Sequence, residues 1–401
     1  MSTPALPLPP SVGRLQRAGG FVGALFLLAL LAGFLLDRPQ FFRSYLFGWI
    51  FWLGVAVGCL GLAMLNQLTG GLWGQVPRRF HEAAARTIPA MAVLFLPVLL
   101  GLGVLYVWAR PDAAADEVLR AKAAYLNVPF FLVRTVAYFA IWSGLVHLLT
   151  RWSLQQDGGP DPVRAIRLQG LSGVGLVVLA GTTTFASIDW GMSLAPHWFS
   201  TMYGVLYIVG WTLSGISFTI VVLALVADEA PMSGALTPTT VHDLGKLLLT
   251  FTMLWAYVNF SQFLIVWSGN TSEETPFYVH RFHGGWGAVA VVLVVFHFAL
   301  PFALLLSRPL KRNPRSLAGV AGLMLLMQLV DLYWLLGPDL VSHGHETVPL
   351  QVHWMDLAAV LGIGGLWIVL FVRQLRARPV LPLGEPAIRA LLGAGAEASA
   401  R

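Results

Sequence analysis

The sequence predicts an all-α integral membrane protein of about ten transmembrane helices, and three observations support this. Hydrophobic residues make up 57% of the 401 residues and charged residues only 11%, whereas a soluble domain is roughly a quarter charged. The mean hydropathy is +0.73. Apolar stretches of roughly 20 residues, the length that a helix needs to cross a bilayer, recur along the chain between short loops.

Ten charge-poor windows mark the predicted spans. They are Phe21–Leu36, Ser44–Gln67, Thr87–Ala109, Asn127–Thr150, Leu168–Ile188, Met202–Ala227, Leu244–Ser268, Gly284–Ser307, Ser316–Leu336 and Trp354–Val372. Residues 1–20 are predicted as a Pro-rich tail, 21–374 as one ten-helix domain and 375–401 as a second tail. Lys and Arg concentrate in the loops on the side of the two termini, and the positive-inside rule assigns that side to the cytoplasm.

This chain has few residues that could bind a metal ion or haem. Cys59 is the only cysteine, so the chain can form neither an internal disulfide nor a cysteine-ligated iron–sulfur cluster. His147 and His297 lie in predicted spans, but their depths differ by about 10 Å at the helical rise per residue, which disfavours a haem held between them. We expect this chain to bind no metal.

Ionisable residues inside spans cost roughly a few kcal/mol unless they are paired or hydrated. Arg134 lies in the fourth span, and we expect it to pair with a carboxylate or with backbone carbonyls as a packing device. Asp331 lies in the outer third of the ninth span, with Gln328 one turn earlier. We interpret Asp331 as a functional carboxyl group, because a charged Asp without a partner is unfavourable in a membrane.

The seventh span carries the longest polar pattern. At helical periodicity, six of its residues fall within a sector about 60° wide that extends for about 38 Å along one face. They are Asp243, Lys246, Thr250, Tyr257, Ser261 and Ser268, and His242 precedes them. This stripe fits a proton- or water-conducting path, and it equally fits hydrogen bonding between helices. Asn259 and Gln262 form a smaller patch on the opposite face, which is more typical of interhelical hydrogen bonding.

Two outer loops carry polar and aromatic residues. The loop from Asp189 to Phe199 contains His197 and suits either a site for a lipophilic redox carrier or an ordinary aromatic belt at the membrane surface. Five charged or titratable residues precede the eighth span: Glu273, Glu274, His280, Arg281 and His283. We interpret them as a docking surface or a proton exit, with a solvated interface loop as the alternative.

Four segments carry a resemblance to a known family. They are SYLFGWIFWLGVAVGCLGLAMLNQLTGGLWG from Ser44, RRFHEAAARTIP from Arg78, SIDWGMSLAPHWFSTMYG from Ser187 and HDLGKLLLTFTMLWAYVNFSQFLIVWSGNTSEETPFYVHR from His242. The last two resemble the polysulphide-reductase-like, or NrfD-like, membrane subunits of alternative complex III. The first two resemble the second of those subunits, called the F subunit or quinone-binding subunit 2 of quinol:cytochrome c oxidoreductase. Asn66 and Gln67 depart from the pattern, in which we expect histidine.

The resemblance implies both an architecture and a role. Spans two to five and spans six to nine would form two four-helix bundles, flanked by the first and last spans. The chain would be a membrane subunit of a quinol:electron-acceptor oxidoreductase of the respiratory chain in the bacterial inner membrane. It would anchor the complex and conduct protons through half-channels, without being catalytic alone. The residues that match polar positions of the motifs are Asp189, His197, His242, Asp243, Lys246, Ser261, Gln262, Glu273 and Glu274.

Partners and cofactors follow from the same resemblance. The expected partners are a second NrfD-like subunit, an iron–sulfur subunit and c-type cytochrome subunits, together with the lipid bilayer and the quinone pool. Haem c and the iron–sulfur clusters would belong to those partners, this chain would hold no cofactor, and quinol is a candidate ligand; nucleic acid is not expected. Two alternatives remain: a purely structural membrane anchor, and a secondary transporter, which the lack of obvious Gly/Pro-broken helices at matching positions in the two halves opposes.

Overall fold

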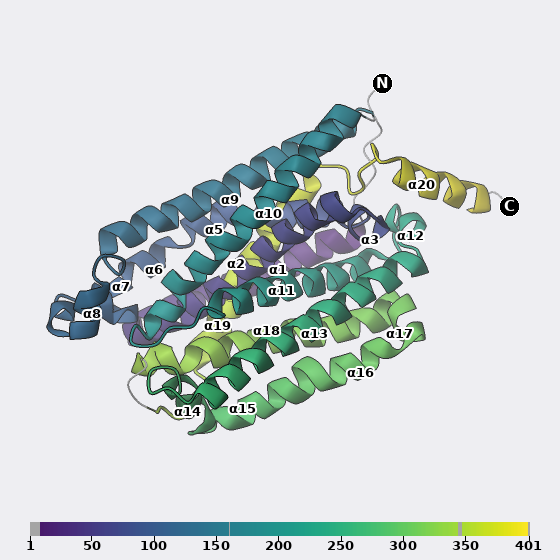
Figure 1. Cartoon of the computed structure of the whole chain (residues 1–401). Helices are drawn as coiled ribbons and strands as arrows, with labels where there is room; N and C mark the ends of the chain where they lie inside the picture. The colour runs from purple at the N-terminus through teal and green to yellow at the C-terminus, as the bar shows by residue number, and fades with distance from the viewer. Residues whose placement is uncertain (1–8, 160, 344–346, 400–401) are drawn as a thin grey trace.

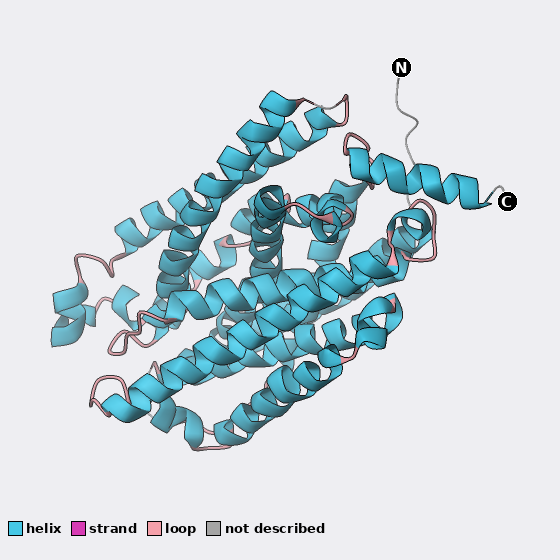
Figure 2. Cartoon of the chain, turned by 45° about the vertical axis from the view of Figure 1, so that its right-hand side comes forward, coloured by secondary structure: helices cyan, strands magenta, loops and turns pink. Residues whose placement is uncertain are grey.

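The computed structural model describes residues 9–159, 161–343 and 347–399. All regular secondary structure in these residues is helical, and ten helical segments are long and apolar enough to cross a membrane. Figures 1 and 2 show these segments running side by side along one common direction. The prediction of an all-α, multi-span membrane protein is confirmed.

Eight spans are single helices and two are divided. The single helices are α1 (Pro10–Leu36), α2 (Arg38–Thr69), α9 (Val128–Gln156), α10 (Pro162–Trp190), α11 (Tyr203–Val226), α13 (Pro238–Gly269), α18 (Pro314–Ser342) and α19 (Trp354–Arg376). The third span consists of α4 (Arg78–Ala85), α5 (Ile88–Val93) and α6 (Leu96–Leu100), continued by α7 (Leu102–Leu105) and the 3₁₀ turn η1 (Val107–Ala109). The eighth consists of α15 (Trp286–Val292), the π-helical segment η4 (Leu293–Ala299) and α16 (Leu300–Leu306).

Short helices connect the spans at both ends of the bundle. They are α3 (Leu72–Gln75), η2 (Ala113–Ala115), α8 (Glu117–Lys122), η3 (Met192–Leu194), α12 (Met232–Ala235), α14 (Pro276–Phe282) and α17 (Arg308–Arg312); α20 (Pro386–Ser399) follows the last span. In Figure 1, α3, α12, α17 and α20 lie at the end where α1 begins, whereas α8 and α14 lie at the opposite end. We call these the inner end and the outer end.

Each predicted window overlaps one span, but most helices are longer than their windows. The side chain of Asp37 caps α2 by accepting a hydrogen bond from the backbone N–H of Gln40 at 3.0 Å, so this helix begins well before the predicted Ser44. Helix α1 begins at Pro10, inside the region predicted as a tail, and α20 occupies much of the other one. The parts of those tails at 1–8 and 400–401 lie outside the described residues.

The third span begins nearer the inner end than its predicted start at Thr87, and it is divided. Helices α5 and α6 each carry a proline in their first turn, Pro89 and Pro97, and α7 starts after Gly101. Proline cannot donate a backbone hydrogen bond, which interrupts the helical ladder at these points. A count of charge-free residues does not detect such breaks.

The spans form two groups of four. In the first group α2 packs against α4 and α10, and α9 packs against α5 and α10. In the second group α11 packs against α13 and α18, and α13 and α18 both contact η4 and α16. Helix α2 packs on α11 between the groups, and α1 lies against α19, which also covers α2. This arrangement matches two four-helix bundles flanked by the first and last spans.

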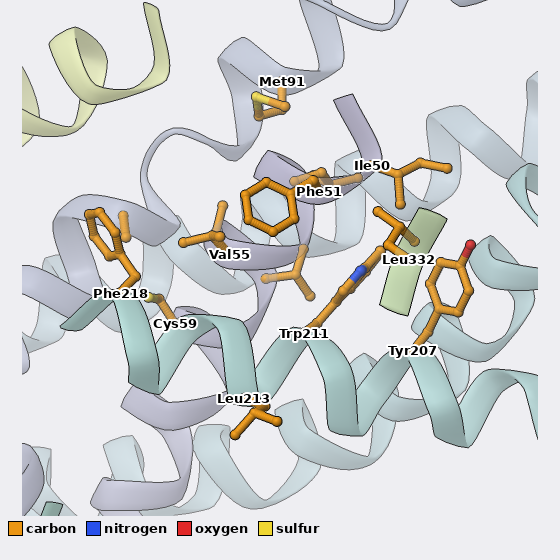
Figure 3. Packing of buried hydrophobic residues seen from close by; sticks show 14 of the residues in the cluster. Ile50, Phe51, Val55, Cys59, Met91, Tyr207, Trp211, Leu213, Phe218 and Leu332 are labelled. Carbon is orange, nitrogen blue, oxygen red and sulfur yellow. The ribbon is translucent and has the colours of Figure 1, made fainter. Parts of the chain in front are cut away.

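Glycines bring the two bundles into close contact where α2 crosses α11. A Cβ atom at Gly54 would collide with the indole of Trp211, and one at Gly58 would collide with the carbonyl oxygen of the same residue. A Cβ atom at Gly215 would lie 2.8 Å from the backbone N of Cys59. Small residues permit this kind of close approach between membrane helices. Figure 3 shows Trp211 projecting from α11 into the buried cluster that the two helices share.

Candidate functional site

A carboxyl group with no basic partner among the described residues lies inside the second bundle. Asp331 of α18 accepts a hydrogen bond at Oδ2 from the indole Nε1 of Trp255 on α13, at 3.0 Å. The amide Nε2 of Gln328, one turn earlier, donates to the same oxygen at 3.2 Å. The other carboxylate oxygen, Oδ1, accepts no hydrogen bond from the described residues. Because an uncompensated charge is costly inside a membrane, Asp331 is a group that gains from taking up a proton or from binding a cation.

A histidine packs beside this carboxyl group. The ring of His297 lies against the indole of Trp255, with the ring centroids 4.0 Å apart. His297 is fully buried, and neither ring nitrogen has a hydrogen-bond partner among the described residues. We call Trp255, His297, Gln328 and Asp331 the second-bundle site.

The backbone around His297 is unusual. It belongs to the π-helical segment η4, where the N–H of Leu300 donates to the carbonyl of Val295, five residues earlier. Pro301 follows and has no N–H to offer to the carbonyl of His297 four residues before it. Segments of π-helix inside α-helices frequently occur at functional sites. His297 was predicted as an ionisable residue within a span and considered as a haem ligand, and Pro301 was the signal for this distortion.

Buried amides extend the polar interior. Both side-chain polar atoms of Gln262 on α13 and the Oε1 atom of Gln328 on α18 are buried without a hydrogen-bond partner among the described residues. A buried polar atom without a partner costs about 1–3 kcal/mol, so these positions favour water, which conducts protons. Gln262 was predicted to form a hydrogen bond to a neighbouring helix, but its side chain forms no such bond in the described part of the chain.

An aromatic chamber of about 520 Å³ adjoins Asp331. Helices α13, α14, α18 and the divided eighth span surround it, and its walls are almost entirely apolar. Its lining consists of Trp255, Ala256, Asn259, Phe260, Phe263, Tyr278, Phe282, Ala290, Leu293, Val294, Phe298, Asp331 and Trp334. Asp331 therefore contacts a space large enough for a small organic molecule.

Asp189, predicted in a proton path, forms a buried ion pair in the first bundle. Arg134 of α9 donates from Nε and Nη2 to its two carboxylate oxygens at 2.9 and 2.8 Å, and the hydroxyl of Tyr138 donates to Oδ2 at 2.8 Å. The guanidinium also lies 3.8 Å from the ring centroid of Tyr125. The prediction that Arg134 pairs with a carboxylate is confirmed. A fully satisfied pair of this kind orients α9 against α10.

The second bundle holds a comparable pair near its outer end. Arg281 of α14 donates to Oδ2 of Asp339 on α18 at 2.6 Å, and its other bonds reach the carbonyls of Phe277, Trp334 and Leu335. Its guanidinium lies 3.6 Å from the ring centroid of Phe277.

The structure therefore divides the predicted docking cluster. Arg281 is fully buried, whereas Glu273 and His283 are exposed and Glu274 and His280 are half-buried. Nδ1 of His283 lies 2.7 Å from the carbonyl oxygen of Val279 within the same short helical region. Only the exposed members remain accessible to a docking partner.

His197 lies at the outer surface against α8. Its Nε2 is 2.8 Å from Oδ2 of Asp116, the residue that caps α8. The backbone N–H of Leu119 lowers the pKa of Asp116 below its ordinary value, and the nearby His197 lowers it further. This contact fastens the loop after α10 to the loop before α9.

The polar stripe of the seventh span faces away from the bundle. The side chain of Lys246 is 58% exposed and Tyr257 is 68% exposed, while Thr250 and Ser268 are also exposed and Asp243 and Ser261 are half-buried. Lys246 donates to Asp243 at 2.9 Å. His242, before the stripe, is half-buried. Of the predicted path residues on α13, only Gln262 is buried in the described structure.

A charged cluster at the inner end was not predicted. Arg79 and Glu82 of α4 are fully buried and 2.7 Å apart, and Arg79 also pairs with Asp157. Arg378, after α19, lies 3.5 Å from Glu82. Burial raises the pKa of Asp157, although the charge of Arg79 acts in the opposite direction. Asp157 and Arg378 come from segments far from Arg79 and Glu82 in the sequence, so no local pattern predicts this cluster.

The fold and these sites define a ten-span α-helical membrane protein with an uncompensated carboxyl group in its interior. Among the residues that the structure describes, no group of three or more His, Cys, Asp or Glu side chains is arranged to hold a metal ion. The chain matches neither a protein-family model nor a curated protein.

Proposed function

We propose that this chain is a proton-carrying membrane subunit of a quinol:electron-acceptor oxidoreductase of the alternative complex III type. The proposal places it in the bacterial inner membrane, as an anchor for partner subunits that carry haem c and iron–sulfur clusters. The second-bundle site would accept and release protons coupled to quinol oxidation elsewhere in the complex. The observation that carries the proton role is Asp331, a carboxyl group inside the bundle with two N–H donors and no cationic partner in the described structure.

Two further features support the subunit assignment. The four motif segments resemble this family, and the two helical groups have the arrangement that the resemblance implies. The inner end carries the arginine-rich segments around Arg78, Arg164 and Arg312, in agreement with cytoplasmic termini under the positive-inside rule.

The predicted path residues take different parts in this proposal. Asp331 and Gln262 belong to the bundle interior and are retained as proton-path residues. Asp189 is fixed by Arg134 and serves as a structural anchor. Asp243, Lys246, Thr250, Tyr257, Ser261 and Ser268 could form a path only where a neighbouring subunit covers this face of α13, because several of them are exposed on this chain.

The assignment to a complex is tested by purifying the tagged chain in a mild detergent and analysing haem and iron in what co-purifies. Partners with c-type haem and iron–sulfur clusters that are reduced by quinol would support it. A protein that remains alone and free of metal under conditions that preserve membrane complexes would contradict it.

The proton role is tested on the complex in liposomes that contain a pH-sensitive dye. Asp331→Asn keeps the shape of the side chain but cannot carry a proton, so we expect unchanged assembly and fewer protons moved per electron. Asp331→Glu should restore the proton count in part, and Glu117→Gln, at an exposed carboxylate of α8, should change nothing. Equal proton counts for Asp331→Asn and the wild type would overturn the proton role; a defect limited to assembly would favour a structural anchor.

A secondary transporter is the second candidate function, because two spans of this chain are broken. The third span is divided near Pro89 and Pro97, and the eighth contains a π-helical segment before Pro301. Broken helices commonly form substrate sites in transporters. These breaks fall in the second helix of one bundle and the third helix of the other, so they do not occupy matching positions. Substrate uptake by the isolated chain in liposomes would favour this candidate.

A further inference from the structure

The aromatic chamber beside Asp331 has the size and the walls of a ligand site. Its volume of about 520 Å³ lies within the range that small-molecule sites occupy. Phe263, Tyr278 and Phe282 form mutual ring contacts on one side, and Trp255 and Trp334 also line it. Phe260 and Val294 line the chamber and are exposed on the lipid-facing surface, so a ligand can enter sideways from the bilayer.

The polar groups of the chamber include two acceptor oxygens. Asn259 donates one N–H of its Nδ2 to the carbonyl of Trp255 at 3.0 Å, which leaves its Oδ1 and its second N–H available. The indole N–H of Trp255 is already bound to Asp331, whose Oδ1 receives no hydrogen bond from the described residues. The chamber therefore offers two acceptor oxygens, together with the hydroxyl of Tyr278, the second N–H of Asn259 and the indole N–H of Trp334, which has no partner among the described residues. A ligand that donates hydrogen bonds complements the two oxygens.

The charge of the site selects the same kind of ligand. Asp189, Asp339 and Glu82 each have an arginine within 2.8 Å, whereas Asp331 has no cation beside it in the described structure. No Lys or Arg lines the chamber, so a phosphate-bearing lipid headgroup would find no counter-charge there. A cation would both neutralise the carboxylate and satisfy the acceptor oxygens, and aromatic rings attract ammonium groups.

We propose that this chamber binds a membrane-soluble amine in its protonated form. The ammonium group would donate to Oδ1 of Asp331 and to Oδ1 of Asn259, while the hydrocarbon part would lie among the aromatic side chains. The occupant is an alkyl or arylalkyl amine without phosphate. This proposal stands on the chamber alone and does not depend on membership of a quinol oxidoreductase.

Equilibrium binding of radiolabelled dodecylamine to the full-length chain in phosphatidylcholine nanodiscs tests the proposal, with empty nanodiscs subtracted. At pH 7 an alkylamine is almost fully protonated, because its pKa is close to that of lysine. We expect one saturable site and at least a roughly tenfold weaker affinity for Asp331→Asn, the scale set by loss of a desolvated charge partner. Unlabelled 1-dodecanol, which lacks the charge, should compete poorly.

A second variant keeps the test independent of the carboxylate. Ala290→Phe fills the chamber while leaving Asp331 in place, and it should also abolish saturable binding. Glu117→Gln, at an exposed carboxylate of α8 outside the chamber, should bind as the wild type does. Loss of binding in Ala290→Phe supports the site even where Asp331→Asn does not fold.

Three results would overturn the proposal. They are wild-type affinity in Ala290→Phe, wild-type affinity in a folded Asp331→Asn, and equal competition by 1-dodecanol.

Nanodiscs that contain phosphatidylethanolamine distinguish the source of the amine. Competition by that lipid would show that an aminophospholipid headgroup occupies the chamber, against our proposal, whereas unchanged binding of dodecylamine supports a ligand without phosphate.

Discussion

Trp255 and Asp331 join α13 to α18 through a 3.0 Å hydrogen bond inside the second bundle, and the same indole packs against His297 of the eighth span. One aromatic side chain therefore links three of the four helices of this bundle. It orients a carboxyl group while leaving one of its oxygens free. This relationship makes the second-bundle site a contact point between helices that also presents a carboxylate oxygen to the aromatic chamber.

Replacing Trp255 by Phe should loosen this joint. The variant keeps an aromatic ring against His297 but removes the donor to Asp331, so one of two hydrogen bonds to this half-buried carboxyl group is lost. We expect a stability loss of about 1–3 kcal/mol, seen as a lower midpoint of thermal unfolding in detergent. Trp267→Phe is the matched control, because Trp267 lies on the same helix and is exposed. Equal midpoints for the two variants would contradict the structural role of the bond.

Removing Arg134 should be more damaging than removing an arginine at the surface. Arg134→Leu leaves Asp189 buried without its cation, and breaking a buried pair in this way costs about 3–5 kcal/mol. Arg164→Leu disrupts the partly exposed pair with Asp161, which we expect to cost at most about 1 kcal/mol. Thermal unfolding of both variants measures the difference.

The double variant Arg134→Leu/Asp189→Leu checks the reason for that loss. Because it removes both charges, it should recover part of the stability that Arg134→Leu alone loses. A double variant as unstable as the single one would mean that packing, and not the uncompensated carboxylate, causes the loss.

The segment after α19 should open when its contacts with the inner charged cluster are removed. Arg78 donates to Glu385 at 2.7 Å, and the backbone N–H of Gly384 donates to Asp157 at 3.3 Å. We expect Glu385→Ala to increase the rate at which trypsin cleaves after Arg378, because local opening exposes the backbone to protease. Limited proteolysis followed by mass spectrometry measures it.

The control for this experiment is Asp228→Ala, which removes an exposed ion pair with Arg315. Its cleavage pattern should equal that of the wild type. Cleavage after Arg378 at the wild-type rate in Glu385→Ala would show that the apolar contacts of Val380 and Leu381, which are fully buried, hold the segment without the ion pair.

The contact between Asp116 and His197 should respond to acid. The pKa of Asp116 is lowered in the folded protein. Its carboxylate therefore stabilises the outer loops at pH values above 3.8, the ordinary pKa of the group. This stabilisation is lost as the pH falls through the lowered pKa. Asp116→Asn should therefore speed amide hydrogen exchange of Val118 and Leu119 at neutral pH.

Two comparisons make this prediction specific. The difference between wild type and Asp116→Asn should shrink as the pH falls below about 3.8, once Asp116 is protonated in the wild type. Asp112→Asn, in the same loop, should exchange as the wild type does. A difference that persists unchanged into strong acid would show that the capping geometry, and not the charge, protects these amides.

Some of the site was predictable because its cause is local. Asp331 stands out within an apolar window, and Gln328 one turn earlier is near enough on any helix to reach it. Arg134 also lies within an apolar window, so a partner that compensates its charge was predictable. The partner itself, Asp189, lies 55 residues away, and no periodicity within either span indicates that pairing.

Other features were missed because they depend on how helices pack. The stripe on α13 is continuous in the sequence, but periodicity alone does not tell whether a polar face points inward or outward, and here it points outward. Arg79 and Glu82 are buried at the inner end of the third span, where Asp157 and Arg378 compensate their charges. A hydropathy window counts those charges against a span and cannot see their partners.

The sequence by itself determined that this protein crosses a membrane ten times, because each apolar window meets the bilayer independently of the others. Only the tertiary structure decided which polar groups are compensated and which are not. That outcome depends on which helices pack together, such as α9 against α10 in the first bundle and α13 against α18 in the second. Asp189 thereby obtains an arginine, while Asp331 obtains two N–H donors and an aromatic chamber.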